Sequence, residues 1–415
     1  MTLKELYTKF TKSKGITTDT RNIQKGSIYL ALKGTNFNGN NFALEALEKG
    51  ATYAIVDEVI ATSNKKIIQV DDCLKTLQDI ANYHRLQLNI PIVALTGSNG
   101  KTTTKEMINV VLSKKYNTSA TTGNLNNHIG VPLTLLEMDK NTEIGIVEMG
   151  ANHLNEIATL TKICAPNFGY ITNFGKAHLE GFGGIEGVIK GKSELYDYLE
   201  TQKKTAFINP KDPLQLEKTK NISTIAFDAL TKILPSQEFL TIVRGELTIS
   251  THLIGSYNIS NLEAAIAIGK HFGVSEIDIK EAIESYHPTN NRSQKIIKKD
   301  AIIILDAYNS NPSSMKVALE NFKVLKGDKK IVILGDMFEL GQTSKEEHLA
   351  IANLAHDLGF DEIHLIGAAF SQTDLQHTNT YDTFEKFEKN FQQKKATYLI
   401  KGSRGMALER VVSLF

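Results

Sequence analysis

The residues of this sequence that are best suited to chemistry are a lysine, two glycines and a row of hydroxyls between an apolar run and a helical pattern. Ile92–Leu95 reads as a buried strand, and the apolar spacing beyond residue 104 predicts a helix. Loop amides and the positive N-terminal end of a helix bind phosphate oxygens, and Lys101 adds a full charge. Leu95 stands where the common phosphate loop has its first glycine, so an ordinary glycine turn is the alternative. The candidate phosphate-binding residues are Gly97, Ser98, Asn99, Gly100, Lys101, Thr102 and Thr103.

An oxygen-ligated metal site is predicted beside this loop. Thr102 follows Lys101, at the position whose hydroxyl reaches Mg²⁺ in phosphate loops. Glu148 ends the apolar run Ile144–Val147, and ligands of open α/β sheets bind at the carboxyl ends of strands. Mg²⁺ prefers one or two carboxylates beside phosphate oxygens. A solvated glutamate at a strand end is the alternative for Glu148.

Two basic residues farther along are further candidates. His178, like Asn173, lies in the loop after the predicted strand Tyr170–Thr172 and so falls on the ligand side of the sheet, although a solvated loop histidine is the alternative. Lys192 interrupts the apolar stripe of a helix predicted over Glu186–Leu199. A lysine in such a stripe must snorkel to solvent, pair with another group or change its charge state.

Several polar segments could also meet a ligand. The asparagine-rich segment 123–132 offers neutral donors and acceptors for a sugar, amide or peptide, unless it is a plain turn. Asn258 precedes a helical pattern and is either a ligand contact or a helix cap. Arg292 lies in a polar, proline-bearing break at 286–292, where it could reach a phosphate or remain a surface side chain. Asp306 ends another strand on the ligand side.

Composition limits the class of protein. The 415 residues predict two to four domains, and 41% hydrophobic with 22% charged residues is typical of a globular protein. A net charge of +1 gives no electrostatic case for nucleic acid or anionic membrane as the main partner. Cys73 and Cys164 lack metal or redox spacing, so buried structural thiols are expected. No apolar run approaches the ~20 residues of a membrane helix and the N-terminus shows no signal region, so we expect a cytoplasmic protein.

Three segments alternate strands with helices, which predicts an α/β protein with parallel sheets covered on both faces. The first has one good helix, Ala43–Lys49, and a glycine- and asparagine-rich stretch, 33–41, that predicts a loop. The expected strands are Ser27–Leu32, Tyr53–Val56 and Ile67–Val70 in the first segment; Ile92–Leu95, Ile144–Glu148, Tyr170–Thr172, Ala206–Ile208 and Ser223–Phe227 in the second; and Ala301–Leu305, Ile331–Leu334, Glu362–Ile366 and Thr397–Ile400 in the third.

Together these motifs resemble those of the Mur ligases of peptidoglycan synthesis. The resemblance spans all three segments and is carried by residues 96–104, 123–132, 148–151, 177–183 with 192–196, 306–311 and 401–406. It implies a small N-terminal α/β domain for a UDP sugar (1–85), a central P-loop-type parallel-sheet domain for ATP (86–292), and a Rossmann-like C-terminal domain for the incoming amine (293–415). Three departures from the family pattern are Tyr257 in place of a histidine, Asp306-Ala307-Tyr308 in place of Asp-Asp-Ser-Tyr and, as a mild change, Asp19-Thr20-Arg21 in place of Asp-Ser-Arg.

The resemblance also implies roles for the catalytic and metal-binding candidates. Lys101 would bind the β- and γ-phosphates of ATP. Thr102 and Glu148 would hold one Mg²⁺. His178 and Lys192 would serve a second Mg²⁺, with Lys192 carbamylated by CO₂. This modification would replace a buried cation with an anion that a metal accepts.

The remaining predicted contacts concern the nucleotide and the sugar. Asn258 would read the adenine, Arg292 would touch the γ-phosphate and Asp306 would hold the ribose. The predicted UDP-sugar contacts are Thr18, Asp19, Arg21, Gly34, Asn38, Asn126 and Asn127, the last two lining the path of the acceptor.

The reaction implied is ATP-driven amide formation through an acyl phosphate. The run 178–183 points to the member of the family that takes D-alanyl-D-alanine as amine and a UDP-muramoyl-tripeptide as acid. The third domain would close over the site, and the protein is expected to be a monomer with small-molecule substrates. One rival is a ligase of the same family that adds a different amino acid. The other is a nucleotide-binding module without catalysis, which the loss of Glu148, His178 or Lys192 would have favoured.

Overall fold

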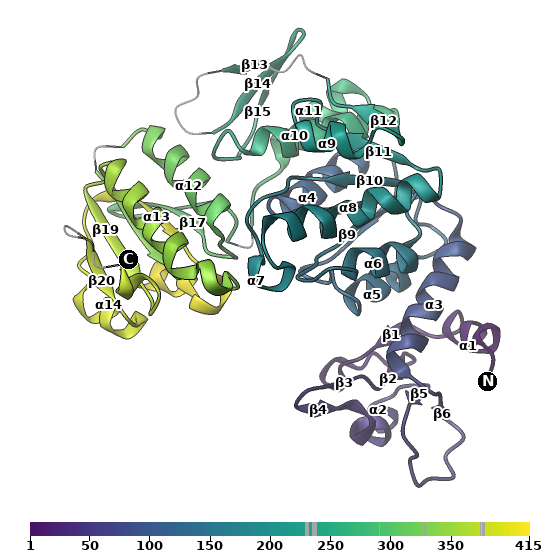
Figure 1. Ribbon diagram of the computed structural model, residues 1–415. Coiled ribbons are helices and arrows are strands. Elements are labelled where there is room, and N and C mark those ends of the chain that lie inside the picture. Colours follow the sequence, from purple (N-terminus) through teal and green to yellow (C-terminus); the bar gives the residue numbers. More distant parts are fainter. Residues whose placement is uncertain (229–231, 235–238, 290, 328, 374, 376–377) are drawn as a thin grey trace.

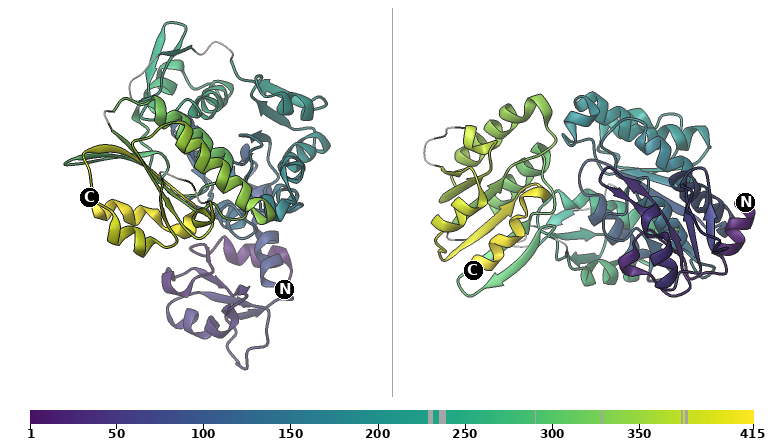
Figure 2. Two further views of the ribbon diagram at one scale, coloured as in Figure 1. Left: turned by 60° about the vertical axis from the view of Figure 1, so that its left-hand side comes forward. Right: turned by 90° about the horizontal axis from the view of Figure 1, so that it is seen from below.

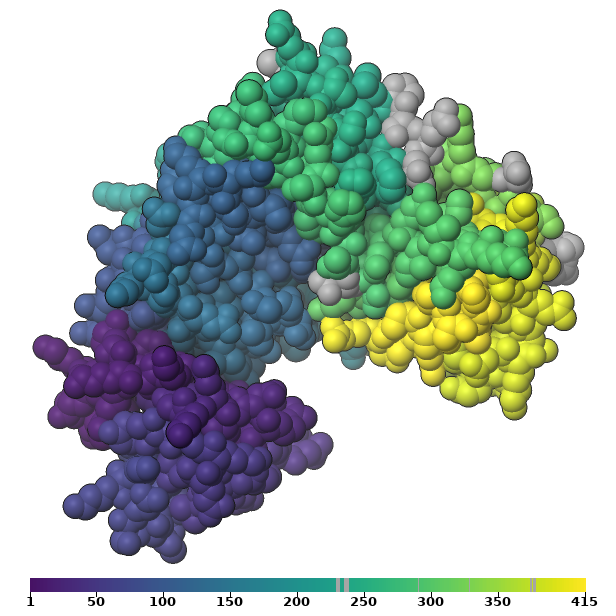
Figure 3. Space-filling view, turned by 180° about the vertical axis from the view of Figure 1, so that it is seen from behind, coloured from purple at the N-terminus to yellow at the C-terminus, as the bar shows by residue number. Residues whose placement is uncertain are grey.

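The computed structural model of the chain describes residues 1–228, 232–234, 239–289, 291–327, 329–373, 375 and 378–415. Three α/β units follow one another along the sequence, and the middle unit lies between the other two (Figure 1). The view from behind shows open space between the two outer units (Figure 3). The expected α/β architecture with three units and parallel sheets is confirmed. Residue 290, inside the predicted break, lies outside the described residues.

The N-terminal unit has a parallel sheet in the order β1-β2-β5-β6, which places the three predicted strands next to one another. Its helix α1 begins with a capping box between Thr2 and Glu5. The elements are α1 (Leu3–Phe10), β1 (Ile16–Thr17), η1 (Thr20–Asn22), β2 (Ile28–Leu30), α2 (Ala43–Glu48), β5 (Tyr53–Val56) and β6 (Ile67–Gln69).

The prediction of a loop throughout residues 33–41 was wrong. Strand β3 (Lys33–Gly34) pairs antiparallel with β4 (Phe37–Asn38), and the 3₁₀ helix η2 (Gly39–Phe42) follows. The Asn38 side chain caps η2 by accepting a hydrogen bond from the Asn40 amide at 3.0 Å. Glycine and asparagine suit tight hairpins and helix caps as well as irregular loops, so composition alone misses this order.

Helix α3 (Cys73–Leu88) joins the first unit to the second and contacts both, lying against α1 on one side and against α5 and α6 on the other. Its buried Arg85 donates to the carbonyl oxygens of Cys164 and Ala165, both at 3.1 Å. Cys73 and Cys164 are buried free thiols, as expected.

The middle unit is built on a six-stranded parallel sheet in the order β12-β11-β10-β7-β9-β8. Its strands are β7 (Ile92–Thr96), β8 (Thr118–Ala120), β9 (Ile144–Glu148), β10 (Phe168–Ile171), β11 (Thr205–Ile208) and β12 (Ser223–Ala226). Its helices are α4 (Lys101–Leu112), α5 (Gly130–Glu137), α6 (Glu156–Cys164), α7 (Leu179–Phe182), α8 (Ile185–Thr201), α9 (Pro213–Lys218), α10 (Asn258–His271) and α11 (Glu276–Ser285).

Strand β7 is apolar from Ile92 to Leu95 because helices cover both faces of the sheet. Val93 and Leu95 belong to a core shared with α4, α10 and α11, whereas Ile92 and Ala94 belong to a core shared with α6 and α8. The phosphate-loop candidates follow this central strand directly. The sheet therefore fixes where the loop begins.

A small antiparallel sheet beside α11 had no counterpart in the sequence predictions. It comprises β13 (Lys232–Leu234), β14 (Thr241–Arg244) and β15 (Leu247–Ser250), and it stands at the top of the middle unit in Figure 1.

The C-terminal unit has a six-stranded sheet in the order β16-β17-β21-β18-β19-β20, in which only the β16–β17 pair is antiparallel among the described residues. The strands are β16 (Gln294–Lys298), β17 (Ala301–Asp306), β18 (Lys330–Gly335), β19 (Glu362–Ile366), β20 (Asn379–Tyr381) and β21 (Ala396–Lys401). Its helices are α12 (Pro312–Val324), α13 (Ser344–Asp357), α14 (Phe384–Asn390), η3 (Gly341–Thr343), η4 (Phe370–Gln372), η5 (Arg404–Met406) and η6 (Leu408–Leu414).

The four predicted strands of this unit are confirmed as β17, β18, β19 and β21. The edge strands β16 and β20 were missed, because both are partly exposed and lack a continuous apolar run. Within the described ranges, no helix is both long and apolar enough to cross a bilayer. Figure 2 shows this unit from two further sides.

Candidate active site

A cavity of about 1240 Å³ lies between the middle and C-terminal units. The phosphate-loop segment lines it from one side, and residues after β17, β18 and β21 line it from the other. Among the predicted site residues, the cavity brings together Ser98, Asn99, Gly100, Lys101, Thr102, Thr103, Asn126, Asn127, Glu148, His178, Asn258, Arg292 and Asp306.

The loop between β7 and α4 has the backbone of an anion cradle. Gly97 and Gly100 have φ values of +143° and +79°, where a side chain is strained, and a Cβ on Gly97 would lie 2.0 Å from Oγ1 of Thr172. Asn173, singled out from the sequence, fixes the loop: its Oδ1 accepts the Asn99 amide at 3.1 Å and its Nδ2 donates to the Asn99 carbonyl at 2.9 Å. The positive φ values and the close neighbours therefore require glycine at residues 97 and 100.

Lys101 begins helix α4 and folds back over the loop. Its Nζ donates to the Gly97 carbonyl at 2.7 Å. Burial lowers the pKa of this amine, the nearby Glu148 acts to raise it, and Arg292 lowers it further. A cation with a depressed pKa at the mouth of an amide cradle is suited to bind an anion, which restores the charged form.

Glu148 is held between two predicted partners. The hydroxyl of Thr102 donates to its Oε2 at 2.9 Å, and Nδ2 of Asn126 donates to its Oε1 at 2.8 Å. The glutamate is 2% exposed, so the alternative of a solvated strand-end carboxylate is wrong. Thr102 and Glu148, the two predicted ligands of one Mg²⁺, therefore lie in contact, and Asn126 joins them. Their role in holding the ion stays a prediction.

Lys192 is 0% exposed, so it does not snorkel. Its Nζ donates to the Ala151 carbonyl at 2.9 Å and lies 5.1 Å from the centre of the Phe182 ring. Burial lowers the pKa of this amine well below 10.5, and Lys101 adds to the effect. Ala151 lines the cavity, whereas Lys192 lies behind it and is not part of the lining among the described residues.

His178 pairs with a residue that the sequence analysis did not single out. Its Nδ1 contacts Oε2 of Glu339, from the C-terminal unit, and the Glu180 amide donates to the Glu339 carbonyl at 3.1 Å. Hydrogen bonding to His178 lowers the pKa of Glu339. The rule that selected Glu148 and Asp306, polar residues just past a strand, applies also to the segment after β18 and could have found Glu339.

Arg292 reaches the cavity beside an aromatic ring. Its guanidinium carbon lies 3.7 Å from the centre of the Tyr308 ring, and the guanidinium carbon of Arg404 lies 4.9 Å from the same centre. Nε of Arg292 is buried and has no partner within the described part of the chain. The predicted alternative of a free surface arginine is wrong for Arg292, because it is half-buried against this ring.

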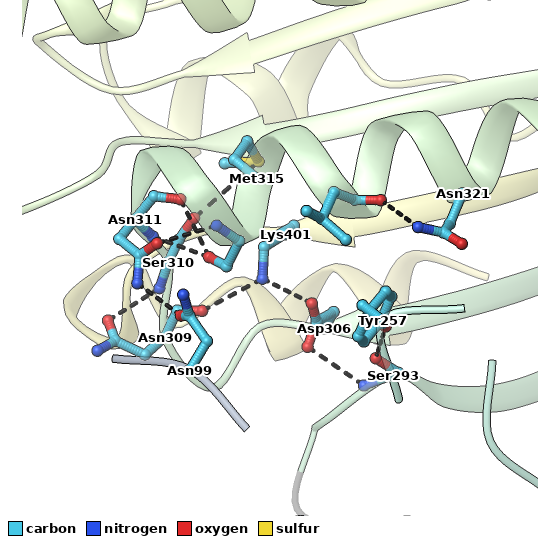
Figure 4. Close-up of polar contacts among 12 residues, drawn as sticks. Asn99, Tyr257, Ser293, Asp306, Asn309, Ser310, Asn311, Met315, Asn321 and Lys401 are labelled. Atoms are coloured by element: carbon cyan, nitrogen blue, oxygen red, sulfur yellow. Dashed lines mark hydrogen bonds and ion pairs between the residues drawn. The ribbon is translucent and has the colours of Figure 1, made fainter. Parts of the chain in front are cut away.

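Asp306 lies in a connected polar group (Figure 4). Its Oδ2 accepts from Nζ of the buried Lys401 at 2.6 Å, and its Oδ1 accepts from the Ser293 amide at 3.2 Å. The hydroxyls of Ser293 and Tyr257 are 2.5 Å apart, and burial raises the pKa of Tyr257. Tyr257, the departure from the family pattern, thus links α10 to the segment before Asp306.

Asn258 lines the cavity but its amide is engaged by the protein. Nδ2 donates to the Ile254 carbonyl and Oδ1 accepts from Asn261, both at 2.9 Å. Asn261 in turn accepts from Thr104 at 3.0 Å and lies against Gly100. Both hydrogen-bonding groups of the Asn258 side chain are therefore used within the protein, where they tie the start of α10 to the phosphate loop.

The N-terminal candidates lie apart from this cavity. Asp19 forms an exposed ion pair with Arg21 at 2.7 Å, and Asn38 donates to Glu58 at 3.0 Å. Thr18 and Gly34 belong to the same unit, and none of these residues lines the cavity among the described residues. Asn126 and Asn127 do line it, on the side toward α3, whose Gln78 is also part of the wall.

Comparison with known proteins decides the family. Residues 12–85 match the profile of the Mur ligase family catalytic domain, residues 95–269 that of the Mur ligase middle domain, and residues 291–407 that of the Mur ligase glutamate ligase domain. The chain belongs to the Mur ligase family.

This Mur ligase is similar along most of its length to curated relatives. It is 34% identical to the UDP-N-acetylmuramoyl-tripeptide–D-alanyl-D-alanine ligase of Bacillus subtilis, with 96% of this chain and 92% of the relative aligned. It is 31% identical to the enzyme of that name from Escherichia coli, with the same coverage. Among solved structures it resembles MurF of Acinetobacter baumannii, with a TM-score of 0.87, 30% identity, and 99% and 98% of the two chains covered. It also resembles the MurF ligase of Thermotoga maritima in complex with ADP, with a TM-score of 0.86, 26% identity, and 97% of each chain covered.

Proposed function

We propose that this Mur ligase joins D-alanyl-D-alanine to UDP-N-acetylmuramoyl-tripeptide in an ATP-dependent reaction. The observation that carries the proposal is the juxtaposition of Lys101, Thr102 and Glu148 in a cavity closed on its other side by the C-terminal unit. The relatives of that name, similar over 96% of this chain, supply the substrate class.

The reaction has two steps in this proposal. The terminal carboxylate of the tripeptide attacks the γ-phosphorus, so a carboxylate O–P bond forms and the bond to ADP breaks. The dipeptide amine then attacks the acyl carbon, a proton leaves the nitrogen and phosphate departs. Lys101 and Arg292 spread the negative charge of the transferring phosphoryl group, and closure of the C-terminal unit excludes water. Asp306 holds the ribose, and Asn258, which lines the cavity at the start of α10, reads the adenine.

The residues beside the loop fit a Mg²⁺ ion. A threonine hydroxyl and a glutamate carboxylate lie 2.9 Å apart at a phosphate cradle, and this ion uses few carboxylates because phosphate oxygens and water complete its shell. Within the described ranges no group of three or more histidine, cysteine, aspartate or glutamate side chains forms a denser site. When bound, the ion neutralises phosphate charge as the carboxylate approaches.

We propose further that Lys192 is carbamylated in the active enzyme and that His178 shares the second ion with it. The fully buried Lys192 has a strongly lowered pKa, which supports a neutral amine able to add CO₂. Labelling with ¹³CO₂ tests this point, and an unmodified lysine in a fully active preparation contradicts it.

The division of labour among the units is part of the proposal. Residues 1–85 bind the UDP sugar through Thr18, Asp19, Arg21, Gly34 and Asn38, residues 86–292 bind ATP, and residues 293–415 bind the incoming amine. Asn126 and Asn127 line the path of the acceptor. The enzyme acts in the cytoplasm as a monomer. Light scattering of the purified protein tests the monomeric state.

A panel of amines tests the proposed function against its rivals. Phosphate release with ATP and UDP-muramoyl-tripeptide should require D-alanyl-D-alanine, and D-alanine, D-glutamate, L-lysine or diaminopimelate should not replace it. Equal turnover with a single amino acid supports another ligase of the family. Nucleotide binding without turnover on any amine supports a module without catalysis.

A further inference from the structure

The sequence motif at residues 401–406 has no part in the steps above, although it faces the cavity. Ser403, Arg404 and Gly405 line the wall that the C-terminal unit contributes, just past the carboxyl end of β21. Phe338, three residues past the neighbouring strand β18, lines the same wall. The carboxyl ends of adjacent parallel strands are where open α/β sheets bind ligands.

Arg404 is the cation of this wall that is available to a ligand. Three of the other basic side chains of the cavity are engaged: Lys101 by the Gly97 carbonyl, His178 by Glu339 and Lys401 by Asp306. Arg404 is exposed and rests with its guanidinium carbon 4.9 Å from the centre of the Tyr308 ring. No carboxylate in the described part of the chain forms an ion pair with it. A guanidinium that lies over an aromatic ring keeps its hydrogen-bond donors available for a planar anion.

An exposed aromatic ring stands beside this cation. Phe338 is 45% exposed, which is high for a phenylalanine, and a Cβ on Gly405 would lie 2.7 Å from its ring carbon Cε2. Ser403, which is buried, fixes both segments: its Oγ accepts from the Phe338 amide at 2.9 Å and donates to the Ser310 carbonyl at 3.4 Å. The cation and the ring are therefore presented together by buried hydrogen bonds.

We infer that Arg404 binds the terminal carboxylate of the incoming amine substrate and that Phe338 contacts its side-chain methyl. This inference rests on the proposed function. A dipeptide of alanine has one anionic end and small apolar side chains, which a guanidinium beside an aromatic ring matches. Two extended residues span about 7 Å. Arg292, the proposed γ-phosphate contact, shares the Tyr308 ring with Arg404, so a dipeptide whose amine attacks beside Arg292 can reach Arg404 with its carboxylate.

The test compares D-alanyl-D-alanine with D-alanyl-D-alaninamide, which lacks the carboxylate. Wild-type enzyme should favour the acid, and Arg404→Ala should raise KM for the acid by about 10- to 100-fold, the range for losing a hydrogen-bonded charge, while changing KM for the amide little. The acid-to-amide ratio of kcat/KM should approach one in the variant. Phe338→Ala should weaken both amines alike, because the methyl is common to them.

Arg410→Ala is the matched control, since Arg410 also stacks on a ring, with its guanidinium carbon 3.6 Å from the centre of Phe384, but does not line the cavity among the described residues. It should leave the ratio unchanged. An Arg404→Ala enzyme that keeps the wild-type preference for the acid overturns the inference, as does a rise confined to the KM of ATP, which would assign Arg404 to phosphate. Failure of wild-type enzyme to use either amine overturns the proposed function instead.

Discussion

Nδ1 of His178, in the middle unit, faces Oε2 of Glu339, in the C-terminal unit, and both residues have left-handed backbones, with φ values of +54° and +61°. Such backbones are uncommon for residues other than glycine and persist where their surroundings fix them. The amide of Glu180 donates to the Glu339 carbonyl, so main chain and side chain both join the units here. The contact leaves Nε2 of His178 to meet a ligand.

Glu339→Ala should therefore lower kcat more than it changes the affinity for UDP sugar. A histidine that holds a metal is oriented by a carboxylate on its other nitrogen, and loss of such a partner costs about 10- to 100-fold. Glu339→Gln, which can still accept a hydrogen bond, should retain more activity. Steady-state kinetics with calorimetric titration of the UDP sugar measures both quantities. Equal activity of the Ala variant and wild type argues against an orienting role.

Lys101→Ala should reduce kcat by at least about 100-fold without unfolding the protein, the loss typical of deleting one preorganised charge. The loop amides remain in the variant, but the ammonium that follows Gly100 is lost. Lys114→Ala, which removes an exposed partner of Glu281 just past the C-terminal end of α4, is the control and should be neutral. Normal turnover of a folded Lys101→Ala enzyme contradicts the phosphate-loop assignment.

Arg292→Ala should weaken turnover more than it weakens binding of the UDP sugar, because we assign the sugar to the N-terminal unit. The side chain is held against Tyr308 at the junction of the middle and C-terminal units. Tyr308→Phe keeps the ring and should be mild. Kinetics beside titration of the UDP sugar separates the two effects, and parallel losses in both would count against the phosphate role.

The buried amine of Lys192 predicts a pH dependence of stability. Burial lowers the pKa of this amine in the folded chain well below the usual 10.5. At pH values between the folded-state pKa and 10.5, the unfolded chain therefore holds a proton on Lys192 that the folded chain lacks. The free energy of unfolding should then rise with pH across that window. In CO₂-free buffer, denaturant unfolding of wild type should show this rise as the pH approaches 10.5 from below, and Lys192→Met should flatten it. An equal slope in both proteins contradicts the assignment.

Lys192→Ala should be nearly inactive if its carbamate is required, and acetate should restore part of the activity by supplying a carboxylate in the vacated space. Turnover with and without acetate measures this. Full activity of the variant without acetate would return Lys192 to a structural role beside Ala151.

The sequence predicted the middle unit well because its signals are local. The apolar strand Ile144–Glu148 and the glycines around Lys101 each specify their own conformation, and position at a strand end brought Glu148 and Asp306 to one cavity. The partners of these residues come from distant segments. Lys401 meets Asp306 across 95 residues, and Glu339 meets His178 across 161, so no spacing in the sequence reports either pair.

Other features were hidden by ambiguity. The Asn258 position suited both a ligand contact and a helix cap, whereas Asn38 was predicted only as a sugar contact in a loop. The structure engages both side chains in the chain's own hydrogen bonds. The partly exposed strands of the small sheet at β13–β15 lack the long apolar run that identified β7. The placement of Arg292 and Arg404 over the Tyr308 ring depends on packing between units, which periodicity cannot reveal.

The Asp306–Lys401 ion pair should contribute to the stability of the fold as well as to nucleotide binding. Lys401→Met leaves a mostly buried carboxylate without its cation, which typically costs about 3 kcal/mol. Adding Asp306→Asn should recover much of this loss, since the uncompensated charge is then gone. Thermal unfolding of wild type, Lys401→Met and the double variant gives the order of their stabilities. A double variant less stable than Lys401→Met would contradict it.

The most direct test of the proposed ligation follows an oxygen atom. UDP-muramoyl-tripeptide labelled with ¹⁸O in its terminal carboxylate is incubated with ATP, Mg²⁺ and D-alanyl-D-alanine. The masses of the products are then measured by mass spectrometry. The account predicts a product extended by the dipeptide and one ¹⁸O in the released phosphate, because the carboxylate oxygen leaves with phosphorus from the acyl phosphate. Phosphate without label, or no dipeptide in the product, would contradict it.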